Sequence, residues 1–110
     1  MNQADNPPDI EAEVTFLSLE QGGKTRSVRS GYRPDHSISA KHSTSGHHEY
    51  LSHDRVEPGE CARAHIWFLA PEIFLHALRP GVEITIQEGV KVVGAAKVLK
   101  VINAKLAAEA

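Results

Sequence analysis

Residues 11–34 read EAEVTFLSLEQGGKTRSVRSGYRP, and the fold prediction starts from them. Over residues 10–16, apolar and polar side chains alternate, which is the period of a strand with one buried face. The pair Gly22 and Gly23 then predicts a tight turn, because glycine adopts positive φ angles without steric cost. Residues 25–30 follow as a candidate second strand, more exposed than the first.

Further strand patterns recur at short spacing along the rest of the chain. They cover residues 36–40, 61–69, 82–86 and 90–102, with turns at Glu57–Glu60, Arg79–Gly81 and Glu88–Gly89. Residues 70–78 are expected to be extended, with a short helical turn as the alternative. Gly94 predicts a bend or a close approach of two backbones. Five to six short strands joined by turns are typical of an all-β sandwich or barrel.

The 110 residues form one domain, predicted to span residues 10–103. We expect residues 1–9 to be a flexible N-terminal tail, residues 41–53 a histidine-rich loop and residues 104–110 a C-terminal tail. The formal net charge of −2 does not predict nucleic-acid binding, so such a site needs a local basic patch. The N-terminus lacks the pattern of a signal peptide, and no apolar run approaches membrane-spanning length. The expected location is the cytoplasm, without membrane association.

The segment from Ser18 to Thr25 nearly matches the phosphate-binding loop G-x-x-x-x-G-K-[ST]. That loop needs a helix whose N-terminus faces the phosphates. Here the first glycine is replaced by Ser18, and Gly31 and Pro34 interrupt the chain too early for such a helix. A turn with Lys24 beside it is the preferred interpretation.

Histidines cluster in the middle of the chain, and neutral imidazole is a good ligand for zinc, nickel or copper. The candidate metal ligands are His42, His47, His48 and His53. Their spacing matches no known zinc motif, so the alternative is an exposed polar loop that responds to pH near 6. No other cofactor is expected.

Cys61, the one cysteine, excludes an internal disulfide and is a weak candidate nucleophile with His53 or His65. No local catalytic signature supports that role, so we expect a buried, inert thiol and no enzymatic activity.

A cationic run follows the glycine turn and includes Lys24, Arg26, Arg29 and Arg33, with Tyr32 among them. Arginine presents a planar fork to phosphates, and tyrosine stacks on a sugar or base. A few such contacts give weak binding that is sensitive to salt. The alternative is an exposed arm balanced by nearby acidic residues.

The chain resembles the third domain of bacterial elongation factor Tu from about residue 10 to residue 103. The motifs are EAEV-x-x-LS from Glu11, E-x-GG from Glu20, SGYRP at residues 30–34, PGE at residues 58–60, and EG-x-K-x-VGA from Glu88. Ala70 and Pro71 stand where that family has His-Pro after a long strand. These motifs are short, but they are specific in combination and in order.

The resemblance implies a six-stranded antiparallel β-barrel, without a GTP site in this chain. It also implies contacts with the backbone of tRNA at Lys24 and Thr25, which replace an Arg and a His of the family, and at the turn of Glu88 and Gly89. Asp35 replaces a glutamine and would repel phosphate.

Two functions are therefore expected, both of a non-enzymatic binding module related to the translation factor. The first is weak binding of the tRNA backbone, with the candidate RNA-binding residues Lys24, Thr25, Arg26, Arg33, Glu88 and Gly89. The alternative is a protein-interaction module that docks on a GTPase domain or another translation-factor partner. A protein that responds to metal through its histidines is the third expectation.

Overall fold

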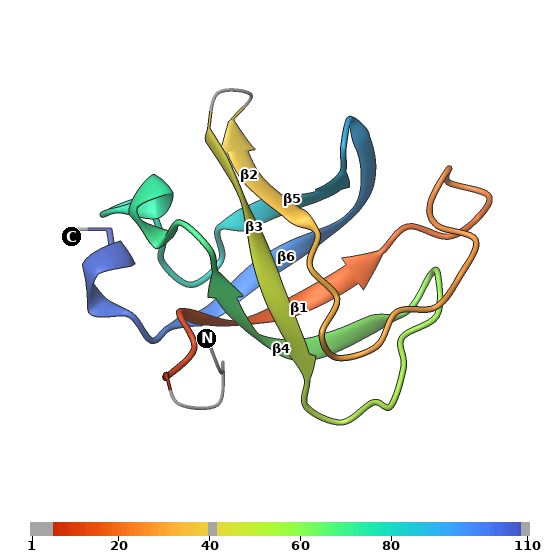
Figure 1. Cartoon of the computed structure of the whole chain (residues 1–110), viewed down its shortest axis with the longest axis horizontal. Helices are drawn as coiled ribbons and strands as arrows, with labels where there is room; N and C mark the ends of the chain where they lie inside the picture. Colours follow the sequence, from red (N-terminus) through yellow and green to blue (C-terminus); the bar gives the residue numbers. More distant parts are fainter. Residues whose placement is uncertain (1–5, 40–41, 109–110) are drawn as a thin grey trace.

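The computed structural model describes residues 6–39 and 42–108, which form a closed barrel of six antiparallel strands (Figure 1). The order around the barrel is β1-β4-β3-β2-β5-β6, and β6 returns to pair with β1. The predicted fold class is thus confirmed. The strands are β1 (Ile10–Phe16), β2 (Asp35–Ser39), β3 (His42–Tyr50), β4 (Cys61–Phe68), β5 (Glu83–Glu88) and β6 (Lys91–Val101).

Alternation along β1 and β4 places one face of each strand in the barrel interior, as predicted. Ile10, Ala12 and Val14 of β1 are fully buried, and so are Ala64 and Ile66 of β4. On the outer face, the register places Glu13 opposite Arg63 of β4 and Lys97 of β6. The ion pair of Arg63 is with Glu11, whose Oε2 lies 3.6 Å from Arg63 Nε.

Gly94 lets β6 approach β1 closely, which confirms the close approach expected at this position. A Cβ atom at Gly94 would lie 2.4 Å from the carbonyl oxygen of Thr15. Real Cβ atoms do not occur that close to a backbone oxygen, so any larger residue here would push the two strands apart. The register of β1 and β6 pairs Thr15 with Ala95 and Phe16 with Gly94.

The expectation of a histidine-rich loop at residues 41–53 is wrong over most of its length. Residues 42–50 form β3, which pairs with both β2 and β4. Its inward positions are Thr44, Gly46, His48 and Tyr50, so the strand alternates without a run of apolar side chains. Lys41 lies outside the described residues, and residues 51–53 belong to the connection to β4.

For residues 70–78 the preferred expectation of an extended segment is wrong, and the alternative, a short helical turn, is confirmed. A 3₁₀ helix, η2 (Pro71–Phe74), follows β4, and a second, η3 (Ala104–Leu106), follows β6. Proline fits the first position of such a helix because its missing N–H has no partner there. Phe74 and Leu106 are fully buried, so the two 3₁₀ helices cover one end of the barrel core.

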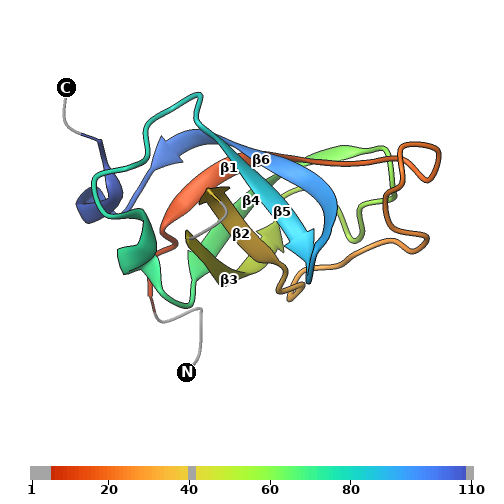
Figure 2. The same cartoon turned by 90° about the horizontal axis from the view of Figure 1, so that it is seen from above.

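The long connection of residues 17–34 lies at the opposite end of the barrel from η2 and η3 (Figures 1 and 2). The predicted turn is present, with Gly22 at a φ of 87°. The predicted second strand over residues 25–30 is reduced to one isolated bridge between Val28 and Val56. Residues 26–34, all of which the structure describes, contain no helix, so the segment from Ser18 lacks the helix that a phosphate-binding loop of this type needs.

Candidate functional site

A cluster of three side chains joins the 17–34 connection to the turn between β5 and β6. The hydroxyl of Tyr32 donates to Glu88 Oε2 at 2.5 Å, and Lys24 Nζ donates to the same oxygen at 2.6 Å. The lysine nitrogen also lies 5.5 Å from the centre of the Tyr32 ring, within cation–π range. We call the surface formed by residues 17–32 and the Glu88–Lys91 turn the loop end.

Local sequence explains how this cluster is positioned. Gly31 has a φ of 102° and turns the chain toward Phe16. The ring of Tyr32 then packs on the Phe16 ring, with 6.1 Å between the two ring centroids. Gly89, with a φ of 61°, allows the two-residue turn that places Glu88 at the end of β5. The glycines at positions 31 and 89 are local signals for the two turns, but nothing local in the sequence shows that the two turns meet.

Electrostatics in the cluster favour an ionised Glu88 and a neutral Tyr32. The hydrogen bond from Lys24 and then that from Tyr32 hold the pKa of Glu88 below its usual value. Burial, followed by the hydrogen bond and charge of Glu88, raises the pKa of Tyr32. The Lys24 charge is therefore largely offset by Glu88, which leaves less positive potential at this point than the sequence suggests.

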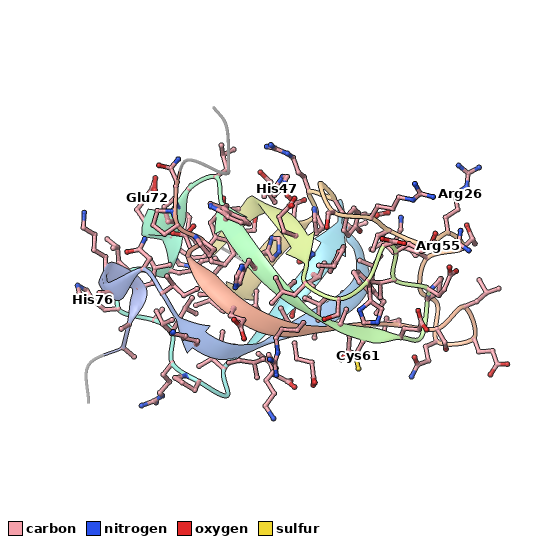
Figure 3. All side chains as sticks on the ribbon, turned by 90° about the horizontal axis from the view of Figure 1, so that it is seen from below. Arg26, His47, Arg55, Cys61, Glu72 and His76 are labelled. Carbon is pink, nitrogen blue, oxygen red and sulfur yellow. The ribbon has the colours of Figure 1, made fainter. Side chains whose placement is uncertain are left out.

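The structure brings together some of the candidate RNA-binding residues and separates one of them. Lys24, Glu88 and Gly89 meet at the loop end, and Thr25 and Arg26 are exposed on the same connection. Figure 3 shows Arg26 at the same end of the molecule as Arg55. Arg33 instead lines a groove with His47 and Trp67.

The candidate metal ligands do not converge. His42 bonds to the Ser39 hydroxyl, His47 pairs with Glu49 on the outer face, and His48 points into the core. His53 is exposed in the connection after β3. Within residues 6–39 and 42–108, no three His, Cys, Asp or Glu side chains gather in a way that could hold a metal ion.

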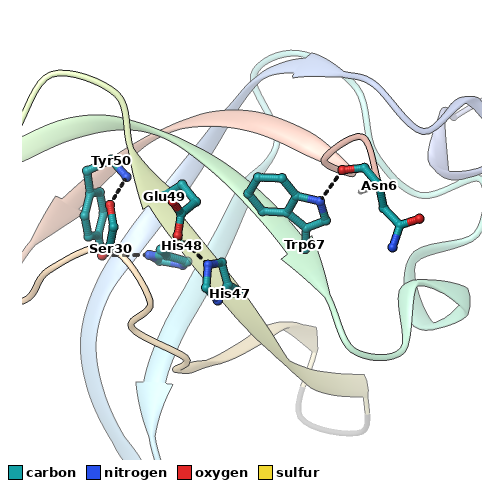
Figure 4. Close-up of polar contacts among 7 residues, drawn as sticks. All are labelled: Asn6, Ser30, His47, His48, Glu49, Tyr50 and Trp67. Carbon is teal, nitrogen blue, oxygen red and sulfur yellow. Dashed lines mark hydrogen bonds and ion pairs between the residues drawn. The ribbon is translucent and has the colours of Figure 1, made fainter. Parts of the chain in front are cut away.

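A buried histidine pair fills the barrel interior between β2 and β3. Nε2 of His36 and Nε2 of His48 lie 2.7 Å apart, and Nδ1 of His48 lies 2.9 Å from the Tyr50 hydroxyl. Figure 4 shows the bond between His48 and Tyr50 and the one from the Tyr50 N–H to the Ser30 hydroxyl. Both rings are fully buried. A single proton can lie between the two Nε2 atoms, so both rings cannot be protonated there together.

Burial determines the charge of this pair. It lowers the pKa of His36 to about 4, against partial compensation by the carbonyl groups of Thr44 and Pro34. Burial, followed by repulsion from His36 and His47, lowers the pKa of His48 well below its ordinary value. Both rings are therefore neutral at pH 7. In the sequence, His36 and His48 stand out only as members of a histidine-rich segment. The period-two spacing from Thr44 to Tyr50 is the signal that could have placed His48 on the buried face of a strand.

Cys61 is exposed at the start of β4, which corrects the expectation of a buried thiol. Figure 3 shows its sulfur projecting away from the ribbon. His65, the neighbour proposed as its base, bonds instead to Glu11 at 3.2 Å. His65 is thus engaged in the charged outer face through Glu11.

The groove that Arg33 lines lies on the outer side of β3 and β4, and we call it the Trp67 groove. Its volume is about 450 Å³, and Arg33, His47, Trp67 and Leu69 are among the residues that line it. Trp67 lies on the outer face of β4, opposite the face that buries Ile66 and Phe68. The sequence could not predict that Trp67 borders a groove, because the groove is also lined by residues that precede β1 and follow β4.

No protein-family model matches this chain. The resemblance to elongation factor Tu therefore rests on the motifs of residues 10–103 quoted above. Among the described residues, no helix has the length and apolar character needed to cross a membrane.

Proposed function

We propose that this protein is a non-enzymatic binding module, related to the third domain of elongation factor Tu, that binds the phosphate backbone of a folded RNA such as tRNA. The observation that carries the proposal is the hydrogen bond of 2.5 Å between Tyr32 and Glu88. It joins the SGYRP motif to the EG turn, which are 56 positions apart in the sequence. The resemblance implies RNA contacts at this turn, and the bond supports the proposal by joining the turn to the motif that carries the resemblance.

The cations of the loop end supply the attraction for phosphate. Arg26 and Arg29 are exposed, and neither makes an ion pair within the described part of the chain. Lys24 adds little because Glu88 holds it at 2.6 Å. Arg33 faces the Trp67 groove, so it does not belong to this RNA-binding surface.

The small number of free cations sets the expected strength of binding. With about two phosphate contacts, the logarithm of the affinity falls with the logarithm of the salt concentration at a slope near −2. Affinity at physiological salt is then weak. This is consistent with a module that contributes to a larger assembly.

The test is a titration with purified tRNA at several salt concentrations. Replacing Arg26 and Arg29 together by Gln is expected to abolish most binding. The slope of log affinity against log salt concentration should become shallower by the contribution of about two phosphate contacts. Arg79→Gln is the matched control, because Arg79 is also exposed but lies in the turn before β5. Absence of binding at low salt, or equal losses in the control and the double variant, would refute the RNA proposal.

A protein partner is the second candidate, and one observation favours it. Val90, at the tip of the β5–β6 turn, is 99% exposed, and Leu19 on the 17–34 connection is 63% exposed. Apolar side chains mixed with arginine are typical of protein interfaces. A GTPase domain of a translation factor is the partner that the resemblance implies. Val90→Asp is expected to abolish its binding. Leu75→Asp is the control and should leave binding intact, because Leu75 follows η2 at the opposite end of the barrel. Equal binding by both variants would exclude this interface.

A further inference from the structure

The Trp67 groove carries features of a small-molecule site that the loop end does not explain. Its volume of about 450 Å³ lies in the range of ligand pockets. Its walls are mainly apolar and come from Pro7, Trp67, Leu69 and Pro71. Leu69 is 77% exposed, so an apolar surface is left open at the rim.

Trp67 is held in a fixed orientation. Its indole N–H donates to the carbonyl oxygen of Asn6 at 2.9 Å (Figure 4). The rings of His47 and His65 contact it edge-on, with centroid distances of 5.8 and 6.3 Å. Because the N–H is already used, the indole offers a ligand its π-system and not a hydrogen bond. A planar ring is the group that such a surface binds best.

The accessible charge in the groove is positive. Arg33 is exposed and makes no ion pair with any residue that the structure describes. Asp9 also lines the groove, but its carboxylate accepts hydrogen bonds from the Phe68 N–H at 2.7 Å and from the Asn103 amide at 2.9 Å. Asp9 is buried, so a ligand meets the guanidinium of Arg33 first. Guanidinium binds carboxylate and phosphate through paired hydrogen bonds.

We propose that the Trp67 groove binds a small organic anion in which a planar aromatic ring carries a phosphate or a carboxylate. The ring lies against Trp67, and the anionic group bonds to Arg33. Nucleoside monophosphates and aromatic carboxylates share this chemistry. The proposal does not depend on RNA binding at the loop end, because the Trp67 groove uses a different set of residues.

Trp67 is the single tryptophan of the chain, so its fluorescence reports on the groove directly. We would titrate the protein with adenosine monophosphate and with indole-free aromatic carboxylates such as benzoate, exciting at a wavelength where the ligands do not absorb. Adenosine and benzamide serve as neutral counterparts. Saturable quenching by at least one anion, with weaker binding of its neutral counterpart, is the expected result, and comparison of the two anions identifies the source.

Arg33→Gln is expected to weaken binding of the anion about tenfold or more, because a hydrogen bond to a charged group is lost. It should leave binding of the neutral counterpart unchanged. Arg79→Gln, an exposed arginine outside the groove, should bind like the unmodified protein. The proposal is overturned if no anion gives saturable quenching at millimolar concentration, or if Arg33→Gln binds the anion as tightly as the unmodified chain.

Discussion

The buried pair His36 and His48 is expected to make the free energy of unfolding fall steeply as the pH drops from 7 to 5. Burial lowers the pKa of His36 from 6.5 to about 4 in the folded protein. The unfolded chain therefore binds a proton at pH 5 to 6 that the folded chain excludes. Protons thus stabilise the unfolded state, and the stability present above pH 6.5 is lost as the pH falls toward 4.

The size of the effect follows from the two pKa values of His36. Their difference corresponds to about 3 kcal/mol in full, of which about 2 kcal/mol is lost between pH 7 and pH 5. His48 adds a loss in the same direction, since its pKa is lowered for the same reason. A domain of this size has about 5–15 kcal/mol of stability in total, so the loss is large enough to measure.

Urea denaturation at pH 7, 6 and 5 tests this prediction. The double variant His36→Leu with His48→Leu should lose much less stability over the same range, because both titrating rings are replaced by apolar side chains. The pair is changed together, since one ring alone would keep a buried nitrogen without its partner. His53→Gln is the control, as His53 is exposed and should leave the pH dependence unchanged.

A pH-independent stability between pH 7 and 5 in the unmodified protein would refute the reasoning. Should the double variant fail to fold, nuclear magnetic resonance of the unmodified protein decides the matter. The ring signals of His36 and His48 should not titrate above pH 5, and titration of either ring near pH 6.5 contradicts their burial as neutral groups.

Two further predictions concern the barrel seam and the loop end. Gly94→Ala should destabilise the protein by about 1–3 kcal/mol in urea denaturation, because the added Cβ meets the carbonyl oxygen of Thr15 at 2.4 Å; unchanged stability would show that β1 and β6 are not this close. Lys24→Gln should raise the pKa of Glu88 toward 4.5, since the Lys24 hydrogen bond is the largest cause of its lowering. Carbon-detected titration of the Glu88 carboxyl measures this shift, and an unchanged value would mean that the two side chains do not pair in solution.

Prediction from the sequence succeeded where apolar and polar residues alternate between clear turns. β1, β4, β5 and β6 all have apolar side chains on one face, and the expected ranges lie close to the observed ones. It failed for β3, because its inward residues Thr44, Gly46 and His48 are not apolar. For residues 70–78 the preferred extended segment was wrong and the alternative helical turn was right, because helical and extended spacing cannot be separated in so short a segment.

The candidate site was only partly predictable. The loop-end residues were selected as a cationic run, yet the neutralisation of Lys24 by Glu88 depends on two segments that lie 64 positions apart. Arg33 belonged to the same run but turned toward Trp67. In the sequence these residues form one group because they are close together and share a positive charge. In the structure their contacts differ, because each residue lies next to a different part of the barrel.

The sequence by itself determined the all-β class, most strand positions and the turns, because side-chain alternation and glycine conformations are local properties of the backbone. Only the tertiary structure decided that His36 and His48 lie inside the barrel, that Cys61 is exposed and that Trp67 borders a groove. Closing the barrel places β3 between β2 and β4. That arrangement gives the two histidines a partner in the interior, and a polar side chain can be buried at low cost only where such a partner exists.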